Sequence, residues 1–125
     1  MKKVILDTNF LLIPGQFKVD IFSEIKRIID DTYELCIIDG TLTELNDITD
    51  KAKKGSDKRA AKLALSLIDS KKFKQIKSDK IVDDAILQQK NVIVATQDAE
   101  LVKKLHKKGV KTIGLRKKSY LILKP

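Results

Sequence analysis

Acidic residues follow two apolar runs of this chain, at positions where a metal ion could be held. Asp7 comes directly after the run Val4-Ile5-Leu6, and Asp98 follows the run 92–95 and Thr96. Both runs are typical of buried strands, and in an open parallel sheet ligands bind beyond the carboxyl ends of the strands. A carboxylate at the end of a buried strand is costly unless it is paired or coordinates a cation. Asp7 is therefore the strongest candidate for a functional acid.

Further acids lie in segments with helical periodicity that start on the same side of the expected sheet. These are Glu44 and the pair Asp83 and Asp84. Each also has a structural explanation, as a solvated helix residue or a polar helix edge, and Asp98 is equally suited to cap a helix. Taken together they indicate a shared site, because crowded carboxylates repel and raise one another's pKa. Mg²⁺ or Mn²⁺ would remove that cost, since both prefer oxygen ligands.

The elements that would position these acids alternate between strands and helices. Apolar runs predict strands near residues 3–6, 34–38, 73–76, 92–95, 110–114 and, at an edge, 120–123. Apolar residues at helical spacing predict helices at 9–12, 17–30, from 39 past 48, from 56 or 57 to 68, 79–90 and 98–108. This alternation indicates one α/β domain over residues 1–125, with a parallel sheet covered on both faces.

Capping and helix-breaking residues predict several helix boundaries. Asn9, Asp39 and Asp98 are expected to be N-caps, and Gly109 is expected just past the end of a helix. Pro14 and Gly15 are expected to end the short helix that precedes them. Asp98 would then stand at the start of its helix, close to the end of the preceding strand.

The segment 79–90 leaves open which of its two central acids faces the strand ends. Its apolar face is set by Ile81, Val82, Ala85 and Ile86. At about 100° per residue, Asp83 and Asp84 flank that face on opposite sides. Periodicity alone therefore allows either acid to reach the site.

Other residues are expected to have structural roles. Cys36 lies in the apolar run 35–38 and is expected to be a small core hydrophobe, because reactive thiols need exposure and a lowered pKa. His106 stands beside Lys107 and Lys108 and is expected at the surface. The helix that starts at 56 or 57 is expected to bury Ala60, Ala61, Leu63, Ala64, Leu67 and Ile68.

The charge balance indicates a polyanionic partner. Lys and Arg number 26 against 17 Asp and Glu, which gives a net charge of +9 and a pI near 9.6. Such an excess attracts nucleic acid, although a lysine-rich solvated surface as in heat-adapted proteins is the alternative. Aromatic residues make up only 5%, so no base-stacking platform is evident. No signal peptide or membrane span is visible, and no basic amphipathic helix carries exposed aromatics, so we expect a cytoplasmic protein that binds no membrane.

Four segments resemble, in order, the four acidic motifs of PIN-domain nucleases. They are Val4-Ile5-Leu6-Asp7-Thr8-Asn9, Thr43-Glu44-Leu45, Asp84-Ala85-Ile86-Leu87 and Val94-Ala95-Thr96-Gln97-Asp98. Any one motif is weak, but four in order over nearly the whole chain are fairly specific. The segment 14–22, Pro-Gly-Gln-Phe-Lys-Val-Asp-Ile-Phe, is more similar to the archaeal and eukaryotic rRNA-processing branch (the small-subunit processome) than to VapC-type toxins.

The resemblance implies a three-layer α/β/α sandwich with a mostly parallel sheet, and hydrolysis of single-stranded RNA with Mg²⁺ or Mn²⁺. It implies that the catalytic metal ligands are Asp7, Glu44, Asp84 and Asp98. It also implies that Thr8, Asn9 and Thr96 are the polar neighbours of these ligands. Because the ligand role goes to Asp84, we expect Asp83 to be a further polar neighbour or a solvated carboxylate. Gln97 departs from the family, which often has Asn there, but the acid that follows is kept. A homodimer is possible in the family, and an antitoxin would be a partner if the chain is a VapC-type toxin.

Two basic clusters are expected to contact RNA phosphates. The first is Lys51, Lys53, Lys54, Lys58, Arg59 and Lys62, and the second is Arg116, Lys117 and Lys118. The main alternative is a non-catalytic RNA-binding scaffold in ribosome assembly, against which the retention of all four acids argues. A receiver domain would need paired acids after its first strand. A phosphatase of the haloacid-dehalogenase type would need an aspartate at position 9, where Asn9 stands.

Overall fold

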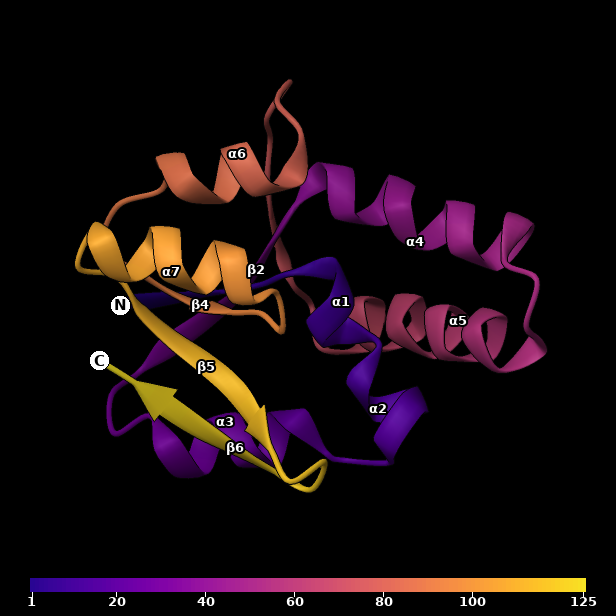
Figure 1. Ribbon diagram of the computed structural model, residues 1–125, viewed down its shortest axis with the longest axis horizontal. Helices are drawn as coiled ribbons and strands as arrows, with labels where there is room; N and C mark the ends of the chain where they lie inside the picture. The colour runs from indigo at the N-terminus through magenta and orange to yellow at the C-terminus, as the bar shows by residue number, and fades with distance from the viewer.

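A six-stranded sheet forms the centre of the computed structural model, which describes residues 1–125 (Figure 1). The strand order is β3-β2-β1-β4-β5-β6; β6 is antiparallel to β5, and all other neighbouring strands are parallel. The strands are β1 (Lys2–Leu6), β2 (Tyr33–Ile38), β3 (Lys74–Ile76), β4 (Val92–Ala95), β5 (Lys111–Arg116) and β6 (Tyr120–Lys124). The predicted parallel sheet with a final edge strand is confirmed.

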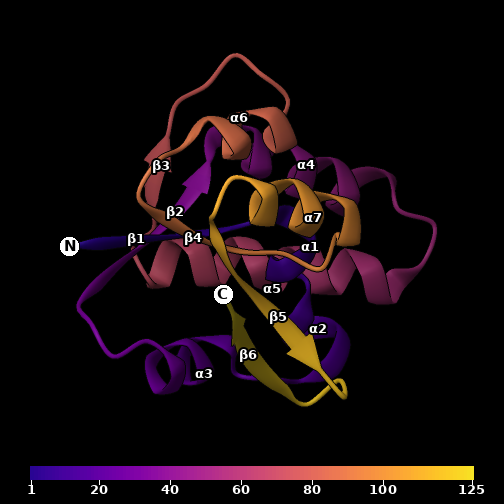
Figure 2. The ribbon, with the colours of Figure 1, turned by 60° about the vertical axis from the view of Figure 1, so that its left-hand side comes forward.

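Helices cover both faces of this sheet, which makes the fold a three-layer α/β/α sandwich (Figure 2). The helices are α1 (Thr8–Leu11), α2 (Ile13–Phe17), α3 (Ile21–Ile28), α4 (Asp39–Lys51), α5 (Gly55–Ser70), α6 (Val82–Gln88) and α7 (Ala99–Lys107). Helices α6 and α7 pack on one face, and α1 to α5 contribute to the larger core on the other. None of the helices combines the length and apolarity that a membrane crossing requires.

The apolar runs of the central strands serve both cores by alternation. In β1, Val4 and Leu6 belong to the larger core, whereas Ile5 packs with α6 and α7. In β2, Ile37 points to the larger core and Cys36 to the smaller one, so the cysteine is a buried core residue as expected. A strand that is buried on both faces needs no polar position, which explains why these runs lack alternation in the sequence.

The first helical segment differs from the expectation because of how closely it packs. Asp7, not Asn9, is the N-cap of α1, and Pro14 and Gly15 lie inside α2 instead of ending a helix. Proline is tolerated in the first turn of a helix, where its missing N–H has no partner to lose. A Cβ at Gly15 would stand 2.6 Å from the Ala60 Cα of α5. Glycine is therefore needed for the contact between α2 and α5.

The starts of three other helices also differ from those predicted from the sequence. Asp39 is the first residue of α4 and not its cap, and its carboxylate accepts a hydrogen bond from the Ser78 N–H at 3.2 Å. Helix α5 begins at Gly55, one or two residues earlier than expected, and its Leu63 is 40% exposed. Helix α6 begins at Val82, three residues later than expected, and the preceding Ile81 is 70% exposed.

The last part of the chain follows its prediction. Asp98 caps α7, and Gly109 has the positive φ of 75° expected just past a helix end. His106 is exposed, and its Nε2 lies 3.0 Å from the Thr112 Oγ1 of β5, away from the carboxyl ends of the strands.

Candidate functional site

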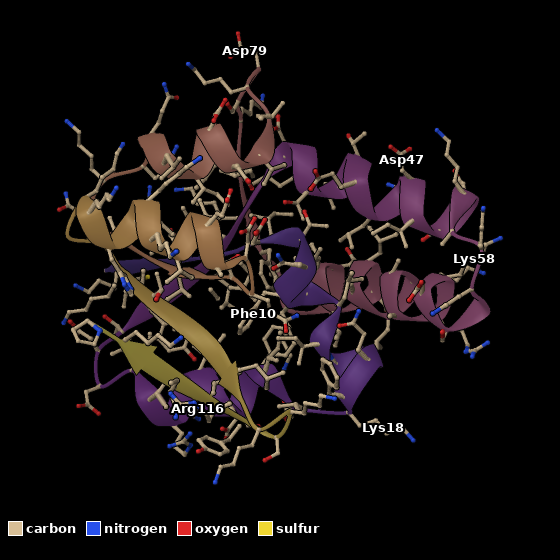
Figure 3. The ribbon with its side chains drawn as sticks, in the orientation of Figure 1. Phe10, Lys18, Asp47, Lys58, Asp79 and Arg116 are labelled. Atoms are coloured by element: carbon tan, nitrogen blue, oxygen red, sulfur yellow. The ribbon has the colours of Figure 1, made fainter.

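An acidic pocket of about 430 Å³ lies beyond the carboxyl ends of β1 and β4. Its wall is built from the β1–α1 junction, α4, the start of α6 and the cap of α7. The lining residues are Asp7, Thr8, Asn9, Leu12, Glu44, Asp47, Ile48, Asp83 and Asp98. Asp47 and Phe10, both labelled in Figure 3, mark α4 and α1 on either side of this region. We call this set the acidic pocket.

Asp7 is the most buried acid of the acidic pocket, with 5% of its surface exposed. Its Oδ1 accepts from the Thr8 N–H at 2.9 Å, and its Oδ2 accepts from the Thr96 hydroxyl at 2.8 Å. Burial raises its pKa from 3.8 to about 6; the two hydrogen bonds oppose this rise, and the charges of Asp83 and Glu44 add to it. Asp7 is therefore held in one orientation while its negative charge is disfavoured.

Hydroxyl groups of two threonines position the Glu44 carboxylate. The Thr8 hydroxyl donates to the Glu44 Oε1, and the Thr8 and Thr41 hydroxyl oxygens are 3.1 Å apart. Thr41 is fully buried one helical turn before Glu44 on α4. Sequence reasoning missed Thr41 and also Asp47, although both stand three residues from Glu44, a spacing that places helix residues on one side.

A set of amide hydrogen bonds ties the two strand-end loops together. The Asn9 Oδ1 accepts from the Gln97 N–H at 3.1 Å, and the Gln97 side chain donates to the Asn9 carbonyl at 3.2 Å. Thr96, which holds Asp7, also accepts from the Asp98 N–H at 3.1 Å. Gln97 thus clamps the loop after β4 to the loop after β1, which fixes the spacing of Asp7 and Asp98.

Asp98 and Asp83 complete the acidic side of the pocket. The Asp98 Oδ1 caps α7 by accepting from the Glu100 and Leu101 N–H groups, at 2.9 and 3.3 Å. The pKa of Asp83 is raised by burial and by the negative charge of Asp98, while Lys104 of α7 counteracts the rise. The two acids are therefore close enough to repel, although they belong to different helices.

The structure brings Asp83, and not Asp84, into the pocket, which differs from the expected assignment of Asp84 as a ligand. The expected assignment followed the family resemblance, because the sequence pattern, which counts Ile81 in the apolar face, left both acids open; Ile81 is exposed and precedes the helix. The buried face of α6 consists only of Val82, Ala85 and Ile86. From the centre of that face, Asp83 lies about 105° away and Asp84 about 155° away. Asp84 therefore points from the sheet toward solvent.

The donor atoms of this pocket suit a hard divalent cation. Carboxylate, hydroxyl and amide oxygens line it, and no cysteine or histidine does. Oxygen-only sites favour Mg²⁺ or Mn²⁺ over softer metals. No three Asp, Glu, His or Cys side chains converge closely enough to hold a metal ion by themselves. Mg²⁺ does not require three such ligands, because it is usually held by one or two carboxylates together with water and substrate phosphates, so the residues present fit such an ion.

The two expected basic clusters lie on different sides of the molecule. Figure 3 labels Lys58, which lies in the first turn of α5, and Arg116, which ends β5 just before the β5–β6 turn. The first cluster begins beside the pocket, because Lys51 pairs with the pocket residue Asp47 at 3.9 Å. In the second, Lys117 and Lys118 both have positive φ, of 54° and 55°.

Comparisons with known proteins agree with this geometry. The model of the family described as PIN like domain matches residues 4–118. Ribonuclease VapC4 of Methanocaldococcus jannaschii is 34% identical over 125 residues, which cover 96% of this chain and 95% of that protein.

Solved structures support the same fold. The structure of the PIN domain endonuclease Utp24 matches with a TM-score of 0.76 and 24% identity, over 97% of this chain and 90% of that one. A domain of a functionally unknown protein from Methanocaldococcus jannaschii matches with a TM-score of 0.64 and 17% identity, over 93% and 92% of the two chains. At these identities the likeness concerns the fold.

Proposed function

Because the chain belongs to the PIN-like domain family, we propose that it is an endoribonuclease whose acidic pocket holds Mg²⁺ or Mn²⁺ against a phosphate of single-stranded RNA. A fold hosts many functions, so the function has to be inferred from the residues of the site. One observation supports the proposed ribonuclease function most directly: four acids from four separate elements, Asp7, Glu44, Asp83 and Asp98, line the same pocket.

We propose these four acids as the candidates from which the one or two direct ligands come, with Asp83 in the place first expected for Asp84. Asp7 and Asp83 both have raised pKa values because of burial and neighbouring carboxylates. A bound cation would reverse that cost, so the arrangement is unfavourable without a metal and favourable with one.

Groups of the protein would orient the metal ligands, and a water molecule would act as the nucleophile. When bound, the divalent cation would lower the pKa of a water molecule and neutralise charge on the scissile phosphate. Thr96 and the Thr8 N–H fix the Asp7 carboxylate, and the Thr8 hydroxyl fixes Glu44. No serine, cysteine or histidine lines the pocket, and the Thr8 hydroxyl is engaged with Glu44. Hydrolysis therefore needs no covalent intermediate with the protein.

The test is cleavage of a labelled single-stranded RNA with Mn²⁺, with and without EDTA. The variants Asp83→Asn and Asp84→Asn form a matched pair, because they remove one charge from adjacent residues of the same helix. We expect Asp83→Asn to reduce single-turnover cleavage by at least about 100-fold, as loss of a group that stabilises the transition state does. Asp84→Asn should stay close to wild type.

Two outcomes would contradict parts of this proposal. An active Asp83→Asn beside an inactive Asp84→Asn would return the ligand role to Asp84. Wild-type protein that binds RNA but does not cut it with Mn²⁺ would favour the non-catalytic scaffold instead.

Two classes of ribonuclease are candidates, a toxin and an rRNA-processing enzyme, and they differ in the RNA that they cut. The 34% identity to a protein named Ribonuclease VapC4 favours a toxin ribonuclease, for which an antitoxin would be the partner. A role in rRNA processing rests on the resemblance of the segment 14–22 to the rRNA-processing branch of the family. Expression in cells separates them: a toxin should arrest growth in wild-type form but not as Asp83→Asn, whereas a processing factor should alter pre-rRNA lengths. Size-exclusion chromatography would test a homodimer.

The two basic clusters are proposed to contact the RNA backbone. Lys51 borders the pocket, and the β5–β6 hairpin extends from the same carboxyl edge of the sheet as Asp7. Each phosphate contact that is lost should lower the slope of log K against log salt by roughly 0.7 for a single strand. Removal of three charges from one cluster without a change in slope would exclude that cluster.

A further inference from the structure

A second cavity lies at the end of the sheet opposite to the acidic pocket. It has a volume of about 860 Å³ and is lined by the starts of β1, β4 and β5 and by the ends of α6 and α7. Its lysines are Lys2, Lys90, Lys108 and Lys111. We call it the lysine cavity. Lys2 and Asp7 are five residue steps apart along β1, which corresponds to roughly 17 Å along an extended strand.

The lysine cavity carries positive charge without internal neutralisation. Leucine, glutamine, asparagine, valine, isoleucine and glycine complete its lining, and no carboxylate is among them. None of its four lysines takes part in an ion pair. Only Lys108 is engaged, through a hydrogen bond from its Nζ to the Leu87 carbonyl at 2.9 Å. Three ammonium groups are therefore free to meet an external anion.

Backbone donors add to these charges. Lys90 and Asn91 line the cavity between α6 and β4, and their N–H groups donate to no backbone acceptor. Asn91 has a positive φ of 58°. Free successive N–H groups at such a turn bind anions in many proteins. The cavity thus offers both charge and directional donors to a phosphate group.

Helix-dipole compensation does not account for this arrangement. Lysines near a helix C-terminus are often present only to balance the partial negative charge there, and Lys108 fits that explanation. Lys2 and Lys111, however, lie on β1 and β5, and Lys90 lies beyond the end of α6. These three gather at the strand starts without a helix carbonyl as partner.

The surface of α6 and α7 joins the two cavities. The helices run side by side in the same direction (Figures 1 and 2). Asp83 near the start of α6 and Asp98, the N-cap of α7, line the acidic pocket, and the ends of both helices line the lysine cavity. Lys104 lies between the two ends of α7, and its charge lowers the pKa of Asp83. Helix α7 is only about 14 Å long, so one strand of RNA could span both sites.

We infer that the lysine cavity is a second binding site for backbone phosphates of the RNA, reached from the acidic pocket along α6 and α7. This inference rests on the proposed ribonuclease function and extends it. It makes the protein sensitive to RNA length, because a strand confined to the acidic pocket would not reach Lys2, Lys90 or Lys111.

The test uses fluorescence anisotropy in EDTA, where no cleavage occurs, over a series of salt concentrations. The variant is Lys2→Gln with Lys90→Gln and Lys111→Gln. The matched control is Lys26→Gln with Lys72→Gln and Lys77→Gln, which removes the same charge from exposed positions near α3, α5 and β3. Exposed substitutions of this kind change stability little, and circular dichroism would check the fold.

With a long single-stranded RNA, the cavity variant should lower the salt slope by about 2 relative to wild type, since each lost phosphate contact contributes roughly 0.7. The control should lower it less, and a trinucleotide should not distinguish the two variants. Equal slopes for both variants on long RNA would overturn the inference even if wild type cuts RNA with Mn²⁺. A lower slope for the cavity variant without any Mn²⁺-dependent cleavage would keep the binding site and reject the proposed catalysis. Absence of RNA binding by wild type would overturn both.

Discussion

Replacement of Asp7 by asparagine should make the metal-free protein more stable at neutral pH. The substitution removes a negative charge from the most buried position of the acidic pocket. The asparagine carbonyl can still accept from the Thr8 N–H, and its NH₂ group can donate to the Thr96 hydroxyl, which now accepts. The side chain keeps its size, so no cavity is created.

The expected gain follows from the pKa of Asp7, which burial raises from 3.8 to about 6 in the folded protein. The folded state binds this proton more tightly than the unfolded state. The free energy of unfolding therefore falls as the pH rises from about 4 to about 6, and it stays low above that. Two pKa units correspond to about 3 kcal/mol. Weaker hydrogen bonds to a neutral amide would offset about 1 kcal/mol, which leaves a gain of about 2 kcal/mol.

The assay is thermal unfolding in EDTA at several pH values. A gain of about 2 kcal/mol should raise the Tm by roughly 8 °C in a domain of this size. About half of the Asp7 penalty should be gone at about pH 5, so the two melting curves should converge as the pH falls. Asp84→Asn serves as the control and should change stability by less than about 0.5 kcal/mol.

Addition of Mn²⁺ should raise the Tm of wild type, because an ion that binds the native state stabilises it. The Tm of Asp7→Asn should not rise, because this variant lacks the carboxylate that we propose to hold the ion. Two results would refute the reasoning. One is an Asp7→Asn variant that melts below wild type at neutral pH in EDTA, and the other is a difference between the two proteins that does not change with pH.

Two further predictions concern the backbone. Lys117 and Lys118 occupy a turn closed by a hydrogen bond from the Ser119 N–H to the Arg116 carbonyl, and their positive φ values suit Asn-Gly better than Lys-Lys. Lys117→Asn with Lys118→Gly should therefore stabilise the protein by about 1–2 kcal/mol in urea unfolding. The same change should lower the slope of log K for RNA against log salt by about 1.4. Stabilisation with an unchanged slope would exclude these lysines from the RNA surface. Gly15→Ala should destabilise the protein by about 1–3 kcal/mol in urea unfolding, because the new Cβ would meet the Ala60 Cα at 2.6 Å. An unchanged urea midpoint would show that α2 can move away from α5.

The sequence was sufficient to predict the sheet and the acids that end its strands. The runs that form β1, β2 and β4 are apolar on both faces, a pattern that few structures other than a covered parallel sheet can satisfy. Asp7 directly follows β1, and Asp98 comes three residues after the end of β4, so strand prediction alone places them at one edge. Glu44 joins them because α4 begins where β2 ends.

Side-chain direction on short helices was harder to predict, because it depends on where each helix begins. With Ile81 counted in the apolar face of α6, Asp83 and Asp84 flank that face alike, and the family resemblance decided for Asp84. Ile81 is exposed and precedes the helix, so the true buried face lies closer to Asp83. The close contact at Gly15 is likewise invisible in the sequence, where Pro-Gly is typical of a helix end. Both differences arise from tertiary packing, which local propensity does not contain.

The way in which the acidic pocket is supported argues for a metal site and against a structural role. A protein with 26 Lys and Arg residues could easily place a cation against buried carboxylates. Here hydroxyl and amide groups hold them instead: Thr96 and the Thr8 N–H hold Asp7, and the Thr8 hydroxyl holds Glu44. The only ion pair at the pocket is the exposed one between Lys51 and Asp47. Neutral donors fix the geometry of the acids without cancelling their charge, so the charge stays available to an external cation.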